Sequence, residues 1–330
     1  MPDLHGLTIG DLRVVRAVAE AESISAAASA LGYSQSGVSR RIAAVERAAG
    51  TTLFVRLPRG VQLTPTGARF HAYALRMMQA AVLAERDLAD ATDATRRLRV
   101  GSFSTANARL VPAALKRLSL TEPDLEVTVR EHRSATLIRW VTAGTVEAAV
   151  VSDYPSGTLR TDGVLLEHLA DDPLVVALAS SHPSATARRL ALHHLAGEPW
   201  IEGDPSETTV LRAAAQRAGF EPRIAHRVRD WNAKLAFVAA GLGAAIVPGL
   251  AATSTRSDVT LRSLPDDLPT RTLYLATTAA SRTLPTVEQF RATTRAVLHD
   301  LRVGSGATHA PLRYSDASHR PAIAKPGPPL

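Results

Sequence analysis

The 330-residue chain contains no cysteine, which excludes disulfide bonds, thiolate zinc sites and cysteine nucleophiles. No uninterrupted apolar stretch approaches the roughly 20 residues that a membrane-spanning helix needs. The first residues lack the basic stretch and apolar run of a signal peptide. We therefore expect a soluble, cytoplasmic protein with no membrane partner.

Motifs of common enzyme classes are absent as well. The chain has no phosphate-binding Gly-x-x-x-x-Gly-Lys-Ser/Thr loop, no His-Glu-x-x-His and no Gly-x-Gly-x-x-Gly. Residues 32–36 fail the Gly-x-Ser-x-Gly pattern of a nucleophile elbow at the last position. Several histidines show no metal-ligand spacing: His132, His168, His182, His193, His194 and His226. The sequence predicts no catalytic residue, no metal site and no cofactor.

Hydrophobic residues make up 45% of the chain, enough for two or three folded units, and the formal net charge is +7. Such a charge favours an acidic partner, either nucleic acid or an anionic membrane. Most of the excess lies between residues 34 and 76, where seven arginines stand against one acid, Glu46. Arginine forms planar, bidentate contacts with phosphates and guanine edges, although a solvated basic face is the simpler interpretation.

The first 50 residues show three helical patterns separated by turns. Apolar residues recur at helical spacing after Thr8, a short second helix begins at Ser23 or Ser25 and ends at Gly32, and a third runs from Ser34 to Gly50. Small residues in the second helix and a glycine-containing turn are typical of a helix-turn-helix.

The outer face of the third helix is polar, as DNA recognition requires. Its candidate base-reading residues are Ser34, Gln35, Ser36, Ser39 and Arg40. The alternative is a generic three-helix bundle.

Next come two short strand patterns, residues 51–56 and 61–64, around the turn at residues 58–60. They predict a hairpin wing that places Arg56 and Arg59 on the DNA backbone, unless Arg56 forms a structural salt bridge.

A long helix is predicted from Pro65 to about Thr95, because no proline interrupts this stretch. Apolar residues with gaps of four or three form the expected seam of a two-helix dimer, extended by Ala89: Ala68, Ala72, Leu75, Met78 and Val82. We interpret residues 65–96 as a linker and dimerisation helix that follows a DNA-binding domain of residues 1–64. Burial of the seam against the chain's own core is the alternative.

After Leu98, strand and helix patterns alternate, which predicts a mostly parallel sheet covered by helices in two similar α/β units. Strands are expected at residues 98–103, 125–129, 146–151, 174–179, 199–201, 223–228, 244–247 and 273–277. Helices are expected at 105–118, 135–143, 190–195, 208–218, 231–240 and 286–301. Subdomain I comprises about 97–168 and 271–302, and subdomain II about 169–270. Residues 303–330 are predicted to form a disordered tail, because they are rich in proline and glycine.

Residues 7–302 resemble a LysR-type transcriptional regulator. The resemblance is most specific at residues 34–40, at Glu46, at Gly50, and at residues 53–56 and 63–67, which match the family signature in order and spacing. Residues 241–248 are the closest match in the second half. The family often has proline where this chain has Ser36, and alanine or proline where it has Gly37. A mid-helix glycine costs about 1 kcal/mol relative to alanine, so we expect a looser start of the third helix.

The resemblance implies a sequence-specific regulator in which two subdomains, similar to periplasmic binding proteins, enclose a small-molecule effector. It also implies self-assembly into dimers and tetramers, a two-fold symmetric promoter site in double-stranded DNA, and RNA polymerase among the partners. The competing interpretation is a solute-binding module without a DNA role, against which the basic helix-turn-helix argues.

Effector contacts are predicted at helix starts that face the cleft between the subdomains, because free backbone N–H groups there favour an organic anion. These residues are Thr105, Ser134 and Thr208, with Trp200 and Trp231 as apolar walls. Each hydroxyl could equally be a helix cap.

Overall fold

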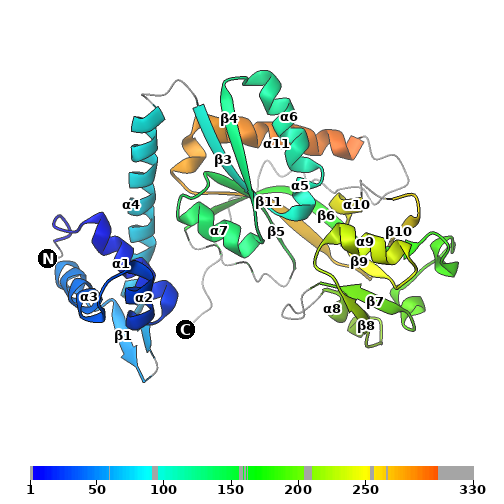
Figure 1. Ribbon diagram of the computed structural model, residues 1–330, viewed down its shortest axis with the longest axis horizontal. Coiled ribbons are helices and arrows are strands. Elements are labelled where there is room, and N and C mark those ends of the chain that lie inside the picture. Colours follow the sequence, from blue (N-terminus) through cyan, green and yellow to red (C-terminus); the bar gives the residue numbers. More distant parts are fainter. Residues whose placement is uncertain are drawn as a thin grey trace.

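The computed structural model describes residues 3–58, 60–90, 96–155, 159, 161, 163–203, 210–252, 256–264 and 267–303. Several predictions concern residues outside these ranges: Arg59, Thr208, the segment 91–95 and the expected tail from 304 onwards. Figure 1 shows a small N-terminal unit, a long helix rising from it, and a larger α/β body.

The N-terminal unit is a helix-turn-helix followed by a hairpin. Its elements are α1 (Ile9–Ala21), α2 (Ile24–Leu31), α3 (Gln35–Ala49) and the antiparallel strands β1 (Phe54–Leu57) and β2 (Gly60–Leu63). The side chains of Thr8, Ser23 and Ser34 each accept a backbone N–H of the first helical turn. Gly32 and Gly50 end α2 and α3 in the left-handed conformation. The predicted helix boundaries are therefore confirmed, with Ser23 as the cap of the second helix.

One apolar core holds this unit together. Val38, Ile42 and Val45 on the inner face of α3 are buried, and Leu53 and Phe54 of the hairpin region pack in the same cluster. The buried members of this core are Val14, Val15, Val18, Ala27, Ala28, Val38, Ile42, Val45, Ala49, Leu53, Phe54 and Val61. Because helices and hairpin share one core, the hairpin has a defined position relative to α3.

Helix α4 (Pro65–Asp90) is fastened to the N-terminal unit at its first turn and again at mid-length. Thr64 donates its backbone N–H to the carbonyl oxygen of Leu53 at 2.9 Å. A Cβ at Gly67 would overlap that same carbonyl, so only glycine allows this close approach. Farther along, Met78 of α4 forms a small buried cluster with Leu12 of α1.

The centre of the expected dimer seam is covered by the chain itself. Leu75 and Met78 are each only 8% exposed. The neighbouring Gln79 donates from Nε2 to the carbonyl oxygen of Val141 at 3.4 Å, at the end of helix α7 (Ser134–Thr142). The seam prediction is therefore wrong for Leu75 and Met78, because both are buried within one chain, and Met78 packs against α1. Of the other seam residues, Ala68 is exposed, Ala72 and Val82 are half-buried, and the side chain of Ala89 lies outside the described part.

Subdomain I contains the parallel strands β3 (Arg96–Ser102), β4 (Leu125–Glu131) and β5 (Ala148–Asp153), with β3 in the middle. The single helix expected from Thr105 to Leu118 is broken into α5 (Ser104–Asn107) and α6 (Leu110–Thr121). Pro112 explains the break, because it lacks an N–H and its ring would clash with the carbonyl four residues earlier in a continuous helix.

Two strands connect the subdomains, β6 (Leu165–Ala179) and β11 (Thr270–Thr277). Strand β11 lies between β5 and β6 and is antiparallel to both. Strand β6 also pairs antiparallel with β9 (Ala245–Pro248) and β10 (Val259–Ser263). The prediction of a mostly parallel sheet is therefore wrong for the pairings of β6 and β11, which are all antiparallel. The chain enters subdomain II along one strand and returns along another that runs against it.

Subdomain II packs helices on a short parallel pair and on the far half of β6. Its remaining elements are β7 (Pro199–Glu202), β8 (Arg223–Arg227), α8 (Val210–Arg217), α9 (Trp231–Ala239), α10 (Gly249–Ala252) and two 3₁₀ turns, Pro183–Ala185 and Leu192–Leu195. The helix expected at residues 190–195 is thus only a 3₁₀ turn, because Gly197 and Pro199 follow too soon. Strand β10 and helix α10 were not predicted, since neither is long enough to show a clear period.

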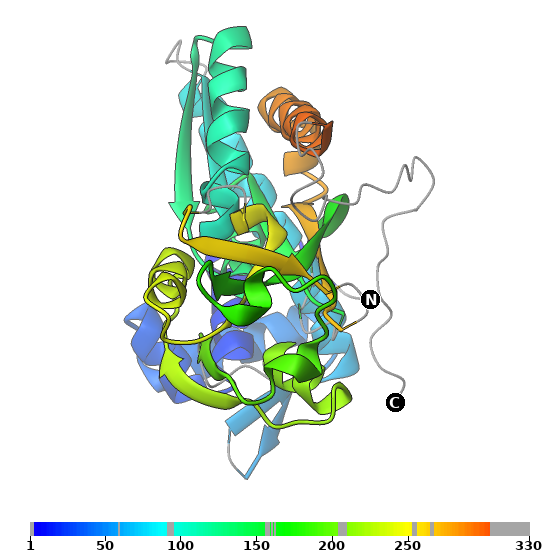
Figure 2. The same cartoon turned by 90° about the vertical axis from the view of Figure 1, so that its right-hand side faces the viewer.

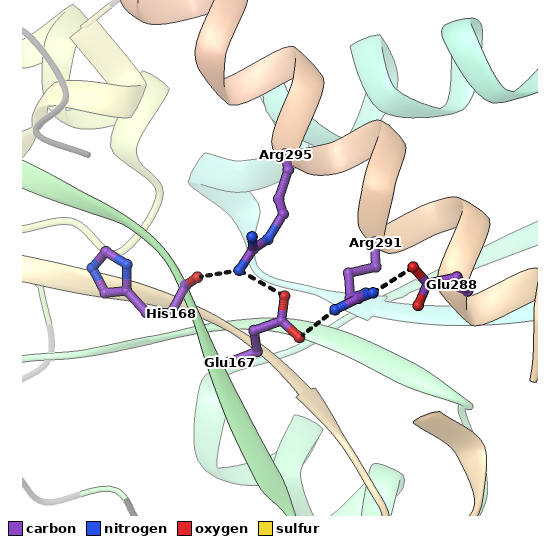
Figure 3. A network of polar contacts seen from close by, with 5 residues as sticks. All are labelled: Glu167, His168, Glu288, Arg291 and Arg295. Carbon is purple, nitrogen blue, oxygen red and sulfur yellow. Dashed lines mark hydrogen bonds and ion pairs between the residues drawn. The ribbon is translucent and has the colours of Figure 1, made fainter. Parts of the chain in front are cut away.

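Helix α11 (Pro285–Val303) follows a 3₁₀ turn, Ser281–Thr283, and closes subdomain I. It lies beside α6, as Figure 2 shows, and Arg117 of α6 pairs with Asp300 at 2.8 Å. Figure 3 shows its attachment to β6: Glu167 accepts from Arg291 at 3.2 Å and pairs with Arg295 at 2.8 Å. Helix α11 therefore packs on α6, an element of the part of the chain that the sequence assigns to subdomain I.

Candidate DNA interface and effector site

The outer face of α3 carries the predicted base-reading residues together. Gln35, Ser36 and Arg40 are exposed and Ser39 is half-buried, while Val38 on the opposite side has no exposed surface. Within the described ranges, Arg40 has no hydrogen-bond or ion-pair partner, so its guanidinium is available to a ligand. This face can therefore present several hydrogen-bonding groups to a groove of DNA.

Ser34 organises the first turn of this helix. Its Oγ accepts the backbone N–H of Gly37 at 3.1 Å and lies 3.2 Å from the Oγ of Ser36. A Cβ at position 37 would stand only 3.1 Å from the Ser34 Oγ, so the glycine leaves room for this cap. The backbone N–H of Gly37 is held by the cap, which counters the looseness expected of a glycine here.

Arg41 is fixed to the first helix, unlike its neighbour Arg40. Its Nη1 donates to Oδ1 of Asp11 at 2.8 Å, and its guanidinium lies 5.5 Å from the centre of the Tyr33 ring. Although partial burial acts to raise it, hydrogen bonds from Thr8 and Arg41 hold the pKa of Asp11 below its ordinary value. Arg41 therefore sets the position of α3 against α1.

Glu46 fixes the start of the hairpin to α3. Its Oε1 accepts the backbone N–H of Leu53 at 2.8 Å and that of Phe54 at 3.1 Å. In the sequence, Glu46 stood out only as the single acid of a basic segment and as part of the family signature. Its position four residues after the buried Ile42 was the available signal that its carboxylate turns inward.

The wing is docked on the end of α1 and leaves an arginine free. Val61 donates its N–H to the carbonyl oxygen of Glu22 at 2.9 Å. Gly60 has a φ of 98°, and a Cβ there would overlap that carbonyl, so the approach needs glycine. Arg56 is exposed and forms no ion pair in the described part of the chain, so the structural salt bridge considered for it is not seen. Figure 1 shows the hairpin projecting from the unit.

The hydroxyls of Thr105 and Ser134, both predicted to contact an effector, each already accept one hydrogen bond within the chain. Thr105 on α5 is 6% exposed, and its Oγ1 accepts from Nη2 of Arg271 at 2.8 Å. Ser134, the first residue of α7, accepts the backbone N–H of Ser152 on β5 at 2.9 Å. Each hydroxyl keeps its own proton and so can still donate to a ligand.

The two predicted tryptophans lie in separate cores of subdomain II. Trp200 has no exposed surface and packs with residues such as Leu174 and Leu192. Trp231, the first residue of α9, is 8% exposed and packs in a second cluster with Ile201. The structure therefore does not bring the two rings together as one wall.

Sequence reasoning missed Glu202, at the end of β7. Its side chain is 8% exposed, and Oε2 lies 4.0 Å from Nη1 of Arg227. Among the residues that the structure describes, its Oε1 has no hydrogen-bond partner. The available signal was that Glu202 directly follows the apolar pair Trp200-Ile201. Acidic side chains are rarely buried without a partner, so an acid that continues a buried strand is a candidate functional residue.

No cluster of metal-ligating side chains occurs among the described residues. None of the described helices is both long and apolar enough to cross a membrane.

The comparisons with known proteins cover both halves of the chain. Residues 9–68 match the model of the bacterial regulatory helix-turn-helix protein, lysR family, and residues 91–299 match that of the LysR substrate binding domain. The transcriptional regulator TfdS of Cupriavidus pinatubonensis is 34% identical over 260 residues, covering 77% of this chain and 87% of the relative. A probable hydrogen peroxide-inducible genes activator of Mycobacterium avium is 33% identical, covering 75% and 80%.

Solved structures agree with this assignment. The OxyR C206 mutant of Corynebacterium glutamicum has a TM-score of 0.55 at 26% identity and covers 89% of this chain and 92% of its own. Full-length CbnR complexed with its target DNA has a TM-score of 0.51 at 26% identity and covers 88% and 99%.

The match to a DNA-binding family model over the N-terminal unit overturns the alternative of a solute-binding module without a DNA role. The relatives are transcriptional regulators, not enzymes. With a capped recognition helix, a docked wing and a two-part α/β body, this chain belongs to the LysR family of DNA-binding transcriptional regulators and carries an effector-binding domain.

Proposed function

We propose that α3 enters the major groove of a two-fold symmetric promoter site while the wing holds the DNA backbone. The observation that carries this proposal is the exposed polar face of α3, together with a neighbouring hairpin on which Arg56 is exposed and has no ion-pair partner among the described residues. Gln35, Ser36, Ser39 and Arg40 read base edges, helped by Ser34 at the start of the helix. Arg56 and Arg59 contact phosphates.

A salt-dependent gel shift on the DNA upstream of the chain's own gene tests this proposal. Binding through phosphate contacts makes the logarithm of the affinity fall linearly with the logarithm of the salt concentration. Preference for this DNA over a scrambled duplex of equal length supports base reading. Equal affinity for the two duplexes at every salt concentration would contradict it.

We further propose that two copies associate through the outer face of α4, and that such dimers pair into tetramers. Tyr73 is 58% exposed and Met77 51% exposed, and Ala80 and Ala84 continue the same exposed stripe. Their successive gaps of four, three and four residues suit a two-helix contact. This stripe replaces the seam residues that the chain itself covers.

For the α/β body, we propose that a small organic anion binds between the subdomains at the start of α7. Arg133, the cap residue of α7, has a guanidinium that cannot accept a hydrogen bond, so its side chain does not cap the first-turn N–H groups. The positive end of the helix dipole and the Ser134 hydroxyl favour a carboxylate. Thr105, Thr208 and Trp231 remain proposed contacts, whereas Trp200 would act from inside the core by holding β7 in place.

A thiol switch is chemically excluded as the sensing mechanism, because the sequence contains no cysteine. This distinguishes the chain from any relative whose response uses a cysteine. We propose that it acts in the cytoplasm, where a regulator bound upstream of a promoter can contact RNA polymerase.

Thermal unfolding with small carboxylates and with their neutral amides tests the effector proposal. A carboxylate that binds should raise the midpoint, and its amide, which lacks the charge, should not. Ser134→Ala should reduce the stabilisation. Stabilisation by the amides alone would contradict an anion site.

A further inference from the structure

Asp172 and Arg271 form an ion pair between the two strands that connect the subdomains. They lie directly opposite each other in the β6–β11 pairing. Nε of Arg271 donates to Oδ2 of Asp172 at 2.8 Å, and Nη2 lies 2.7 Å from the same oxygen. The side chains are 5% and 0% exposed, so water does not screen the pair.

The pair is attached to a different subdomain at each end. Arg271 donates from Nη2 to Thr105 at 2.8 Å and lies 5.0 Å from the centre of the Phe103 ring, both after strand β3 of subdomain I. Asp172 accepts the backbone N–H of Leu250 at 2.8 Å, in α10 of subdomain II. Two residues therefore join both subdomains and both connecting strands.

The surroundings fit tightly around this cluster. A Cβ at Gly249 would stand 3.0 Å from Oδ1 of Asp172, so the first residue of α10 must be small. Burial raises the pKa of the Asp172 carboxyl, and Arg271 with the backbone N–H groups of α10 opposes that rise. Loss of one partner would leave an uncompensated buried charge.

We propose that Asp172 and Arg271 are positioning residues that lock the angle between the two subdomains. A hinge made only of two connecting strands would let the subdomains rotate, because strand ends can absorb changes of φ and ψ. Beside the packing of Leu250 in the core of subdomain I, the ion pair restricts this freedom by tying α5 to α10 across the strands. It also holds Thr105 in place, so a contact of an effector with that hydroxyl would reach the hinge directly.

Distance measurement between spin labels tests the lock without any effector or DNA. Because the chain has no cysteine, Leu120→Cys on α6 and Arg223→Cys on β8 supply two specific labelling sites. Leu120 is 72% exposed and Arg223 is exposed too, so labels there should disturb neither core. Dilution of labelled into unlabelled full-length protein leaves only distances within one chain.

The otherwise unchanged chain should give one narrow distance distribution. Arg271→Met should broaden it about twofold or shift its maximum, because the subdomains then sample more than one angle. Where that variant does not fold, Asp172→Asn combined with Arg271→Met removes both charges and keeps an acceptor for Leu250. An unchanged distribution in a folded variant would overturn the proposal.

Glu147→Gln is the matched control. Glu147 is a buried acid that pairs with Arg99 inside subdomain I and accepts its backbone N–H at 2.6 Å. This variant should lose stability yet keep the narrow distribution. A broadening equal to that of Arg271→Met would show that general loss of stability, and not the lock, controls the angle. Because no effector is present, failure of the lock is distinguishable from failure of the effector site.

Discussion

Arg41 of the recognition helix α3 donates to Asp11 of α1 at 2.8 Å. This contact holds α3 and α1 in the fixed relative position that DNA binding needs. The same carboxylate caps α1, since it also accepts the hydroxyl and the backbone N–H of Thr8. One acid therefore serves the helix start and the helix packing.

Asp11→Asn should weaken the N-terminal unit in a pH-dependent way. The pKa of Asp11 in the folded chain is below its ordinary value, so its stabilisation is present above about pH 4 and is lost as the pH falls below that. We expect a loss of about 1 kcal/mol or less at pH 7, because Arg41 is partly exposed, and a smaller difference at pH 3. Urea unfolding at both pH values measures this, and Arg41→Met should show part of the effect. An equal loss at both pH values would contradict the linkage.

Arg40→Ala and Arg56→Ala should impair DNA binding differently. Arg56→Ala should weaken binding to all sequences and lower the salt slope by about one, because one phosphate contact is lost. Arg40→Ala should cost about 1 to 3 kcal/mol on the preferred sequence and relax the preference at one position. Titrations at several salt concentrations check both. Arg212→Ala, on α8 of subdomain II, is the control, and wild-type behaviour of the Arg40 and Arg56 variants would rule out this face.

Gly67→Ala should destabilise the junction of the wing and α4. The added methyl would overlap the Leu53 carbonyl oxygen, which also accepts from Thr64, so backbone must shift. We expect a cost of about 1 to 3 kcal/mol, typical of overpacking. Gly6→Ala is the matched control, because a Cβ there meets nothing within 4 Å. Thermal unfolding compares the two variants. Equal unfolding midpoints would contradict the prediction, because they would mean that the backbone around Gly67 accommodates the methyl group at little cost.

Met77→Glu should impair dimerisation, whereas Leu75→Glu should impair folding, because the two side chains lie on different faces of α4. Met77 is 51% exposed, so its replacement should leave the fold intact and abolish dimers in sedimentation velocity. Leu75 is 8% exposed, so a charge there should lower the unfolding midpoint. A Met77→Glu protein that remains dimeric would place the interface elsewhere.

The sequence by itself determined the features that depend on near neighbours. Thr8, Ser23 and Ser34 cap helices through bonds to residues three positions away, and Gly32 and Gly50 end helices through their own backbone freedom. Such interactions need no distant partner. For the same reason the polar face of α3 and the wing could be predicted as a candidate DNA interface.

Only the tertiary structure decided where distant segments meet. Leu75 and Met78 satisfy the pattern of a dimer seam, but both are already buried within one chain, Met78 against α1. Asp172 and Arg271 are 99 residues apart and meet only because β6 and β11 pair in one antiparallel register. A periodic pattern states that a face is buried without stating against what. Side-chain packing and strand pairing over the whole chain decide which segment covers that face. A short stretch of sequence contains no information about the energies of these long-range contacts.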